Sequence, residues 1–302
     1  MTKNYAHTPV LLEEAIEGMN ICKDGIFIDA TFGSGGHSKK ILSLLSSKGK
    51  LIAFDQDKLA FKYAPNVNNF ILFHSNFIYL KNFIKLLEIS QVDGIIADLG
   101  ISSMHIDMAE RGFSYRFNAP LDMRMNREQD FTAQDVVNNY SQETLAKIFF
   151  EYGQLRNANT IAKSIVKARE HKKIITTYDL VAIVEKLIPS KIKNKVLSKI
   201  FQAIRIEVNE ELENLKIFLQ IGTEVLKKGG RFVIITFHSL EDRIVKNYFK
   251  TGTFDGIVKK DIYGNAISPL RPVNKKVIVP SEQEQNQNSR SRSAKLRISE
   301  KL

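Results

Sequence analysis

Residues 25–55 read GIFIDATFGSGGHSKKILSLLSSKGKLIAFD, and this stretch decides the fold. An apolar run, 26–28, ends in Asp29. Three glycines follow within four positions: Gly33, Gly35 and Gly36. A segment with apolar residues at helical spacing comes next, and a second apolar run, 51–54, ends in Asp55. A strand, a glycine-rich loop, a helix and a second strand ending in a carboxylate are typical of a doubly wound sheet that binds an adenosine.

The glycine loop leaves three interpretations open. A dinucleotide-binding loop has the pattern GxGxxG, which counted from Gly33 needs Gly or Ala at position 38, where this chain has Ser38. Asp29, four residues before the first glycine, would repel a pyrophosphate but suits the ammonium group of a methionine moiety. S-adenosylmethionine therefore fits better than NAD, with another nucleotide or a purely structural turn as the alternatives.

The composition is that of an ordinary globular protein. The 302 residues are 43% apolar and 25% charged, enough for one large core or two smaller ones. No apolar run approaches the roughly 18 residues that a membrane span needs, and the N-terminus lacks a secretory pattern. The single cysteine, Cys22, excludes an internal disulfide and a cysteine-based zinc site. Because His7, His74 and His238 also lack metal-ligand spacing, we expect a cytoplasmic protein without a metal.

The net charge of +11 is concentrated in two segments. Residues 156–205 carry 12 Lys or Arg against three acidic residues, and residues 271–302 carry eight against three. Clustering of this kind is typical of a protein that binds a polyanion, although a solvated helical surface would show it too. Arg156, Lys163 and Lys167 are spaced seven and four residues apart, which predicts that they share one face of a helix.

Further apolar runs predict three more strands of the same sheet, at 70–74, 92–99 and 231–237. A helix at 210–226 and a turn at 227–230 are expected before the last of them. The polar tail from residue 273 onward, with the low-complexity segment SEQEQNQNSRSRSAKLR, is expected to be an extended arm.

More than a hundred residues separate the fourth expected strand from the fifth, and apolar spacing predicts that nearly all of them are helical. The expected helices are 141–152, 155–170, 178–188 and 196–208. Thr176 and Asp179 resemble a capping box at the start of the third. These patterns indicate a helical domain, 106–209, inserted into a discontinuous cofactor domain, 1–105 and 210–302.

Seven blocks of sequence, in order along the chain, carry a resemblance to a known family. They are HTPVLLEEA (7–15), DATFGSGGHS (29–38), DLGISS (98–103), RGFSYRFNAPLDMRM (111–125), QAIRIEVNEEL (202–212), TFHSLEDRIVK (236–246) and SRSAKLR (291–297). The chain resembles the ribosomal RNA small subunit methyltransferase H family, which methylates the N4 atom of a cytidine in bacterial 16S rRNA. The resemblance implies a class I methyltransferase fold of the α/β type, a doubly wound Rossmann-like sheet with an inserted all-helical domain. It also implies S-adenosyl-L-methionine as cofactor and the 16S rRNA of the small (30S) subunit as partner.

The same resemblance implies the cofactor contacts. In the glycine loop they fall on Gly35, Gly36 and His37. Asp55 would bind the ribose, Phe77 would pack on the adenine, and Asp98 would be the next contact. The last contact falls on His105, where the family has glutamine, and Met104 replaces the family's proline beside it. In the insertion, RFNAP stands where RDGP is usual, and YGQLRNANTIAKSIV lacks the usual acidic pair.

Asp98 is also the candidate catalytic residue. The N4 amine of cytosine is a poor nucleophile because its lone pair is delocalised into the ring, and an acceptor on the amine hydrogens would localise that lone pair. DNA amino-methyltransferases have an Asp/Asn-Pro-Pro-aromatic motif at the same place, of which only the acid is present here.

Two other functions stay open from the sequence: a small-molecule methyltransferase, and a non-catalytic RNA-binding protein with a relic methyltransferase fold. The glycine loop is intact and both Asp29 and Asp55 are present, which argues against a non-catalytic relic. The oligomeric state and the target nucleotide also stay open.

Overall fold

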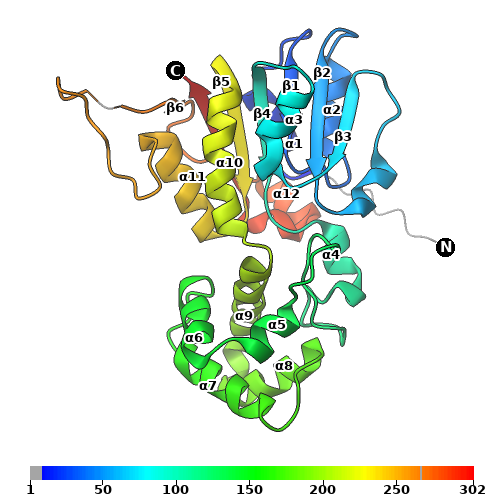
Figure 1. The fold of residues 1–302 in the computed structure, drawn as a ribbon, viewed down its shortest axis with the longest axis vertical. Helices are drawn as coiled ribbons and strands as arrows, with labels where there is room; N and C mark the ends of the chain where they lie inside the picture. Colours follow the sequence, from blue (N-terminus) through cyan, green and yellow to red (C-terminus); the bar gives the residue numbers. More distant parts are fainter. Residues whose placement is uncertain (1–8, 266) are drawn as a thin grey trace. The chain divides into compact units, whose positions relative to one another are not determined.

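A computed structural model describes residues 9–265 and 267–302 of the chain, so His7 and Thr8 of the first sequence block lie outside it. The chain divides into two compact units, whose elements are labelled in Figure 1. Unit 1 comprises Met1–Gly100 and Leu212–Leu302, and unit 2 comprises Ile101–Glu211. Across the described ranges, no helix is both long enough and apolar enough to cross a membrane.

Unit 1 is built on a seven-stranded sheet with the order β3-β2-β1-β4-β5-β7-β6. The strands are β1 (Ile26–Asp29), β2 (Lys50–Asp55), β3 (Phe70–His74), β4 (Val92–Asp98), β5 (Leu226–Thr236), β6 (Leu270–Pro272) and β7 (Lys295–Lys301). The first five pair in parallel, and β7 is antiparallel to both β5 and β6. The strand order reverses between β1 and β4, where doubly wound sheets bind their ligands at the carboxyl ends of the strands. The sheet confirms the predicted fold class.

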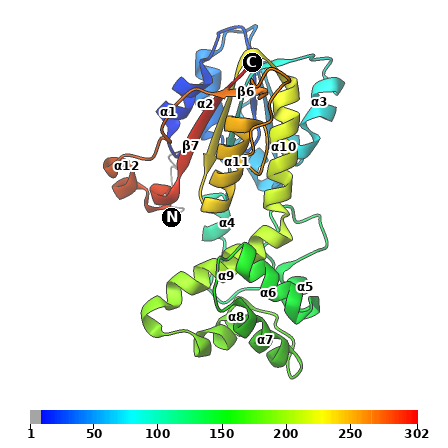
Figure 2. The ribbon, with the colours of Figure 1, turned by 90° about the vertical axis from the view of Figure 1, so that its left-hand side faces the viewer.

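Helices cover both faces of this sheet, as Figure 2 shows. The helices of this unit are α1 (Leu12–Met19), α2 (Gly36–Leu44), α3 (Leu80–Leu86), α10 (Glu211–Val225), α11 (Ser239–Thr251) and α12 (Glu282–Gln287), with short 3-10 helices η1 (Lys58–Tyr63), η2 (Phe77–Tyr79) and η6 (Ser289–Ser293). α1 and α2 pack on the face that carries Phe27 and Ile96. α3, α10 and α11 pack on the opposite face, which carries Ile28 and Ile95. Because neighbouring residues of a strand point to opposite faces, strands covered on both sides are apolar throughout, which is the pattern that predicted them.

The prediction that the polar tail is an extended arm is wrong. Residues 295–301 form β7, which lies between β5 and β6 in the sheet. Leu296 and Ile298 are buried in the core on the α1 and α2 face. Lys295 and Arg297 form ion pairs with Asp242 of α11, at 3.1 and 2.7 Å. The strand was missed because its alternation of apolar and polar residues follows directly on a low-complexity polar segment.

Two smaller predictions also fail. The turn expected at 227–230 lies within β5, where the pairing with β4 shifts register between Val92 and Gly94. Arg156 does not share a helix with Lys163 and Lys167, because α7 begins only at Ala158. A turn precedes that helix, in which Gln154 has a positive φ of 51°.

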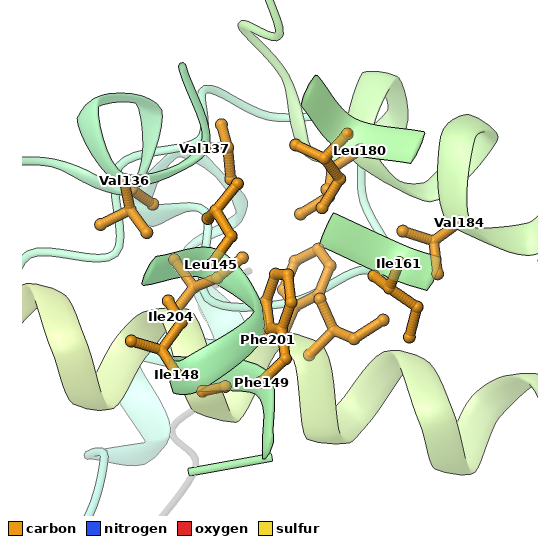
Figure 3. Close-up of a cluster of buried hydrophobic side chains, with 14 of the residues drawn as sticks. Val136, Val137, Leu145, Ile148, Phe149, Ile161, Leu180, Val184, Phe201 and Ile204 are labelled. Atoms are coloured by element: carbon orange, nitrogen blue, oxygen red, sulfur yellow. The ribbon is translucent and has the colours of Figure 1, made fainter. Parts of the chain in front are cut away.

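Unit 2 is helical around a single core, part of which is drawn in Figure 3. Its helices are α4 (Ser103–Asp107), α5 (Ala133–Asn139), α6 (Gln142–Glu151), α7 (Ala158–Arg169), α8 (Thr177–Val184) and α9 (Lys193–Val208), with 3-10 helices η3 (Ala109–Arg111), η4 (Glu185–Leu187) and η5 (Ser190–Ile192). Leu145, Ile161 and Leu180 come from three of these helices and meet in the core. The capping box predicted for Thr176 and Asp179 is present at the start of α8.

Candidate active site

The glycine loop leads from β1 into α2, and different structural constraints require glycine at its different positions. Gly33 and Gly35 have φ values of 55° and 77°, in the left-handed region that other residues disfavour. A Cβ on Gly33 would meet nothing closer than the Thr31 carbonyl oxygen at 4.0 Å. A Cβ on Gly35 would instead lie 2.7 Å from the Phe32 ring. The backbone at Gly33 is therefore open to a ligand, whereas Gly35 is required by packing.

Gly36 and His37 form the first turn of α2, so their N–H groups lie at the N-terminus of that helix. A Cβ on Gly36 would lie 2.0 Å from Pro9, which leaves room only for hydrogen. The His37 ring is buried, and its Nε2 lies 3.2 Å from the Val10 carbonyl oxygen. Since a carbonyl oxygen can only accept, Nε2 is the donor, and the neutral ring has its lone pair on Nδ1.

Asp29 holds the glycine loop in place through two hydrogen bonds. Its Oδ1 accepts a hydrogen bond from the Thr31 N–H at 3.1 Å, and its Oδ2 accepts one from the Ser38 hydroxyl at 2.7 Å. Burial raises the pKa of Asp29 to about 6, against the lowering effect of these two hydrogen bonds, and the Asp55 carboxylate raises it further. The carboxylate that the sequence suggested for a methionine ammonium group thus also holds the loop and α2 together.

Asp55 ends β2 and reaches back to the same loop. Its Oδ2 accepts a hydrogen bond from the Gly33 N–H at 2.7 Å, and its Oδ1 accepts one from the Asp57 N–H at 2.8 Å. Each carboxylate oxygen has a second lone pair, so these bonds orient the group and leave acceptor capacity for the two hydroxyls of a ribose.

Asp98 ends β4 beside the glycine loop. Its N–H donates to the Thr31 hydroxyl at 2.7 Å, and its Oδ2 lies 3.9 Å from His37 Nδ1. The other oxygen, Oδ1, is buried and accepts no hydrogen bond from any residue that the structure describes. Burial raises the pKa of Asp98 well above its ordinary range, and the carboxylates of Asp29 and Glu241 raise it further. A buried acceptor atom without a donor is costly, and a ligand that donates to it would remove that cost.

Phe77 opens η2, just after β3, and is half-buried. Its ring packs against Phe218 of α10, with centroids 4.7 Å apart. This contact leaves the ring part of the core on one side and partly exposed on the other, which an aromatic residue that packs on an adenine requires.

Glu241, at the start of α11, is a residue of the site that the sequence reasoning missed. It is buried, and its Oε2 accepts hydrogen bonds from the N–H groups of Phe237 and His238 at 2.9 and 3.3 Å. His238 caps the helix, with its Nε2 lying 3.2 Å from the other Glu241 oxygen. The block TFHSLEDRIVK contained the signal, because a polar residue followed three positions later by Glu is a capping-box pattern.

His105, the last expected cofactor contact, belongs to unit 2. Its ring is buried and stacks on Phe113, with centroids 5.0 Å apart and planes 18° apart. The guanidinium carbon of the fully buried Arg111 also lies over the Phe113 ring, 5.9 Å from its centroid. Its guanidinium group donates to the carbonyl oxygens of Arg124 and Met125. Within unit 2, residues of the block 111–125 therefore hold one another and His105 in place. The spacing of the sequence did not predict this structural role.

The residues of unit 1 fit a cationic adenosine derivative. Asp29 and Glu241 are buried carboxylates close enough to Asp98 to raise its pKa, so a positive charge placed among the three carboxylates is favoured and a pyrophosphate is not. The open backbone at Gly33 and the oriented Asp55 carboxylate supply the surface for the adenosine. The strand order and this set of groups define a class I methyltransferase that uses S-adenosylmethionine.

Comparison with known proteins gives the family. The family model of the MraW methylase family matches residues 4–302, and the chain belongs to this family. The ribosomal RNA small subunit methyltransferase H of Bacteroides fragilis is 53% identical over 295 residues, which are 98% of this chain and 97% of that protein. The protein of the same name from Flavobacterium johnsoniae is 50% identical over 296 residues, 98% of each chain.

A solved structure of an rRNA methylase from Streptococcus thermophilus is 13% identical over 100% of this chain and 99% of that chain, with a TM-score of 0.40. That likeness is loose, and the strand order of the sheet itself defines the fold class.

Proposed function

We propose that this protein transfers the methyl group of S-adenosylmethionine to the exocyclic N4 amine of a cytidine in the 16S rRNA of the small ribosomal subunit. Membership of the MraW methylase family and the relatives that are named ribosomal RNA small subunit methyltransferase H support this function. The single structural observation that carries it is Asp98, a strand-end carboxylate with one buried oxygen that accepts no hydrogen bond from the described residues.

The cofactor would be held by the groups of unit 1. The N–H groups of Gly36 and His37, together with the Gly33 backbone, line the loop, while Gly35 shapes it. Asp55 binds the ribose hydroxyls and Phe77 packs on the adenine. The resemblance also implies a contact from His105, whose ring is held within unit 2 by its stacking on Phe113.

When bound, S-adenosylmethionine supplies an electrophilic methyl group, so the protein's task is to orient the amine, exclude water and accept a proton. Asp98 Oδ1 would accept a hydrogen bond from the amine and so localise its lone pair. The raised pKa of Asp98 suits a carboxylate that then takes up the proton.

Unit 2 would bind the rRNA, with the assembled 30S particle as the substrate and the cytoplasm as the place of action. Its segment 156–205 holds most of the excess positive charge, and Lys163 and Lys167 are exposed on α7. A small-molecule methyltransferase needs no such surface.

Radiolabelled cofactor separates the possible functions. The full chain is incubated with S-adenosyl-[methyl-³H]methionine and either 30S particles, naked 16S rRNA or free nucleosides, and the products are digested and resolved by mass spectrometry. We expect label in N4-methylcytidine from the 30S particles. Label that appears only in free nucleosides would indicate a small-molecule methyltransferase. Binding of rRNA without methylation of any substrate would indicate a non-catalytic RNA-binding protein with a relic methyltransferase fold.

A further inference from the structure

We propose that unit 2 carries a stacking platform for unpaired nucleotides of rRNA, formed by Phe117 and Tyr178 and bordered by Arg116 and Lys172. This stacking platform rests on the proposed function, because it assigns part of the RNA surface of the same enzyme. All of these residues belong to unit 2.

Tyr178 lies at the start of α8 and is turned away from the core. The residues of that helix that face the core are Thr177, Leu180 and Val184, all buried, whereas the Tyr178 side chain is 47% exposed. Leu180 and Val184 are seen in the core in Figure 3. The Tyr178 hydroxyl donates to the Arg116 carbonyl oxygen at 3.1 Å, which restrains the ring of this exposed side chain.

Phe117 lies on the neighbouring segment and is 45% exposed. That segment is held by Thr177, whose hydroxyl donates to the Phe117 carbonyl oxygen at 2.5 Å and accepts from the Ala119 N–H at 3.1 Å. The Thr177 N–H also donates to the Ala119 carbonyl oxygen at 2.9 Å. The backbone under both aromatic side chains is thus fixed before any ligand arrives, so little conformational entropy is lost when a base stacks on them.

The charges beside the two rings suit a polyanion. Arg116, which precedes Phe117, and Lys172, which pairs with the neighbour of Tyr178, are both exposed. The acidic neighbour Asp179 is already engaged, because its carboxylate accepts hydrogen bonds from the Thr176 N–H and hydroxyl and from the Lys172 ammonium. Exposed aromatic rings among cationic side chains are the arrangement that binds single-stranded nucleic acid, since the rings take bases and the cations take phosphates.

The test measures the affinity of the full chain for 16S rRNA and for 30S particles as a function of salt. We expect Tyr178→Ala and Phe117→Ala each to weaken binding to both by about 5- to 150-fold, the range for one stacked base. The slope of log K against log salt should not change, because no ionic contact is removed. Tyr178→Phe keeps the ring and should retain most of the affinity. Phe150→Ala removes an aromatic residue that is 64% exposed on α6 and serves as the matched control.

A second readout is independent of affinity. The chain has no tryptophan, so Tyr178→Trp introduces a single indole whose fluorescence is quenched when a base stacks on it. We expect quenching on saturation with 16S rRNA, and none for Phe150→Trp.

The possible outcomes separate this proposal from the function on which it rests. If the wild-type chain methylates 16S rRNA while Tyr178→Ala and Phe117→Ala keep full affinity, the stacking platform alone is refuted. If the two variants bind 30S particles more weakly but bind naked 16S rRNA as the wild type does, the surface contacts a ribosomal protein instead of RNA. That result would also refute the stacking platform. A wild-type chain that neither binds nor methylates 16S rRNA, whether naked or in 30S particles, would refute the proposed function itself.

Discussion

Asp98 combines three properties that a residue in contact with both cofactor and amine would need: a strand-end position, a buried acceptor oxygen and a raised pKa. Asp98→Asn keeps an acceptor oxygen but removes the charge and the capacity to take a proton. We expect kcat to fall by about 10²-fold or more at saturating cofactor, since the lost interaction strengthens in the transition state. Single-turnover and steady-state kinetics with 30S particles measure this.

Asp55→Ala is the control for that variant. It should weaken cofactor binding by about 1.5–3 kcal/mol, the range for hydrogen bonds to a charged group, while kcat at saturation stays near the wild-type value. A full kcat for Asp98→Asn at saturating cofactor would limit Asp98 to cofactor binding. Calorimetric titration showing unchanged affinity for Asp55→Ala would remove Asp55 from the site.

Asp29 predicts a pH dependence of stability. Its pKa is about 6 in the folded chain against an ordinary 3.8, so between these values the folded state binds more protons than the unfolded state. The free energy of unfolding therefore contains a contribution from Asp29 that is complete below pH 3.8 and is lost as pH rises through 6. Asp29→Asn abolishes that loss, so the variant should gain about 2 kcal/mol relative to wild type between pH 4 and 7. Urea denaturation at each pH measures the difference, and a difference that does not vary with pH would contradict the assignment.

The sequence located three of the four carboxylates of the site but not the partners of those three. Asp29, Asp55 and Asp98 follow from one rule, that parallel strands end at one edge of the sheet. The hydrogen bonds from Ser38 to Asp29 and from Gly33 to Asp55 depend on side-chain directions, which spacing does not give. Glu241 was missed for a different reason, because it is close to Asp98 only through the pairing of β4 with β5.

At the scale of elements, prediction succeeds where a pattern is local and uninterrupted. β1 and β3 begin and end at the predicted residues, since both are short apolar runs with clear limits. β7 was missed because an exposed polar segment precedes it and only two of its side chains, Leu296 and Ile298, carry the apolar signal. Its place in the sheet depends on pairing with β5, which lies far from it in the chain.

Leu296 tests the role of β7. Its side chain is fully buried on the α1 and α2 face, so Leu296→Ala should destabilise unit 1 by about 2–5 kcal/mol through lost burial and a cavity. Thermal or urea unfolding measures the loss. The paired variant Arg290→Ala and Arg292→Ala changes two exposed residues of the same tail and should leave stability within about 0.5 kcal/mol. If Leu296→Ala is as stable as the wild type, β7 does not contribute to the core, and the original prediction of an extended arm would hold.

At the scale of the whole molecule, the positive charge of the two basic segments is not equally available. In the tail, Arg271 pairs with Glu300, and Lys295 and Arg297 pair with Asp242. In unit 2, Lys163 and Lys167 are exposed on α7, and Lys172 is 75% exposed even though it pairs with Asp179. The insertion is therefore the better candidate for phosphate contacts.

Replacing Lys163, Lys167 and Lys172 together by Gln should weaken rRNA binding and flatten its salt dependence. Each phosphate contact that is lost reduces the slope of log K against log salt by roughly 0.7–0.9. Affinity for S-adenosylmethionine should not change. Filter binding at several salt concentrations gives the slope, and an unaltered slope would mean that this basic surface is only solvated.

The pairing of β4 with β5 has a consequence for how the chain reaches its native state. These neighbouring strands are separated in sequence by all of unit 2, so bringing them together closes a loop of more than a hundred residues. Each doubling of a flexible loop costs about 0.6 kcal/mol in chain entropy, and an insertion that has already collapsed around its own core shortens the effective loop. Folding of unit 2 should thus accelerate completion of the sheet. Leu145→Ala, which weakens only the core of unit 2, should slow the refolding of unit 1 without altering one of its contacts.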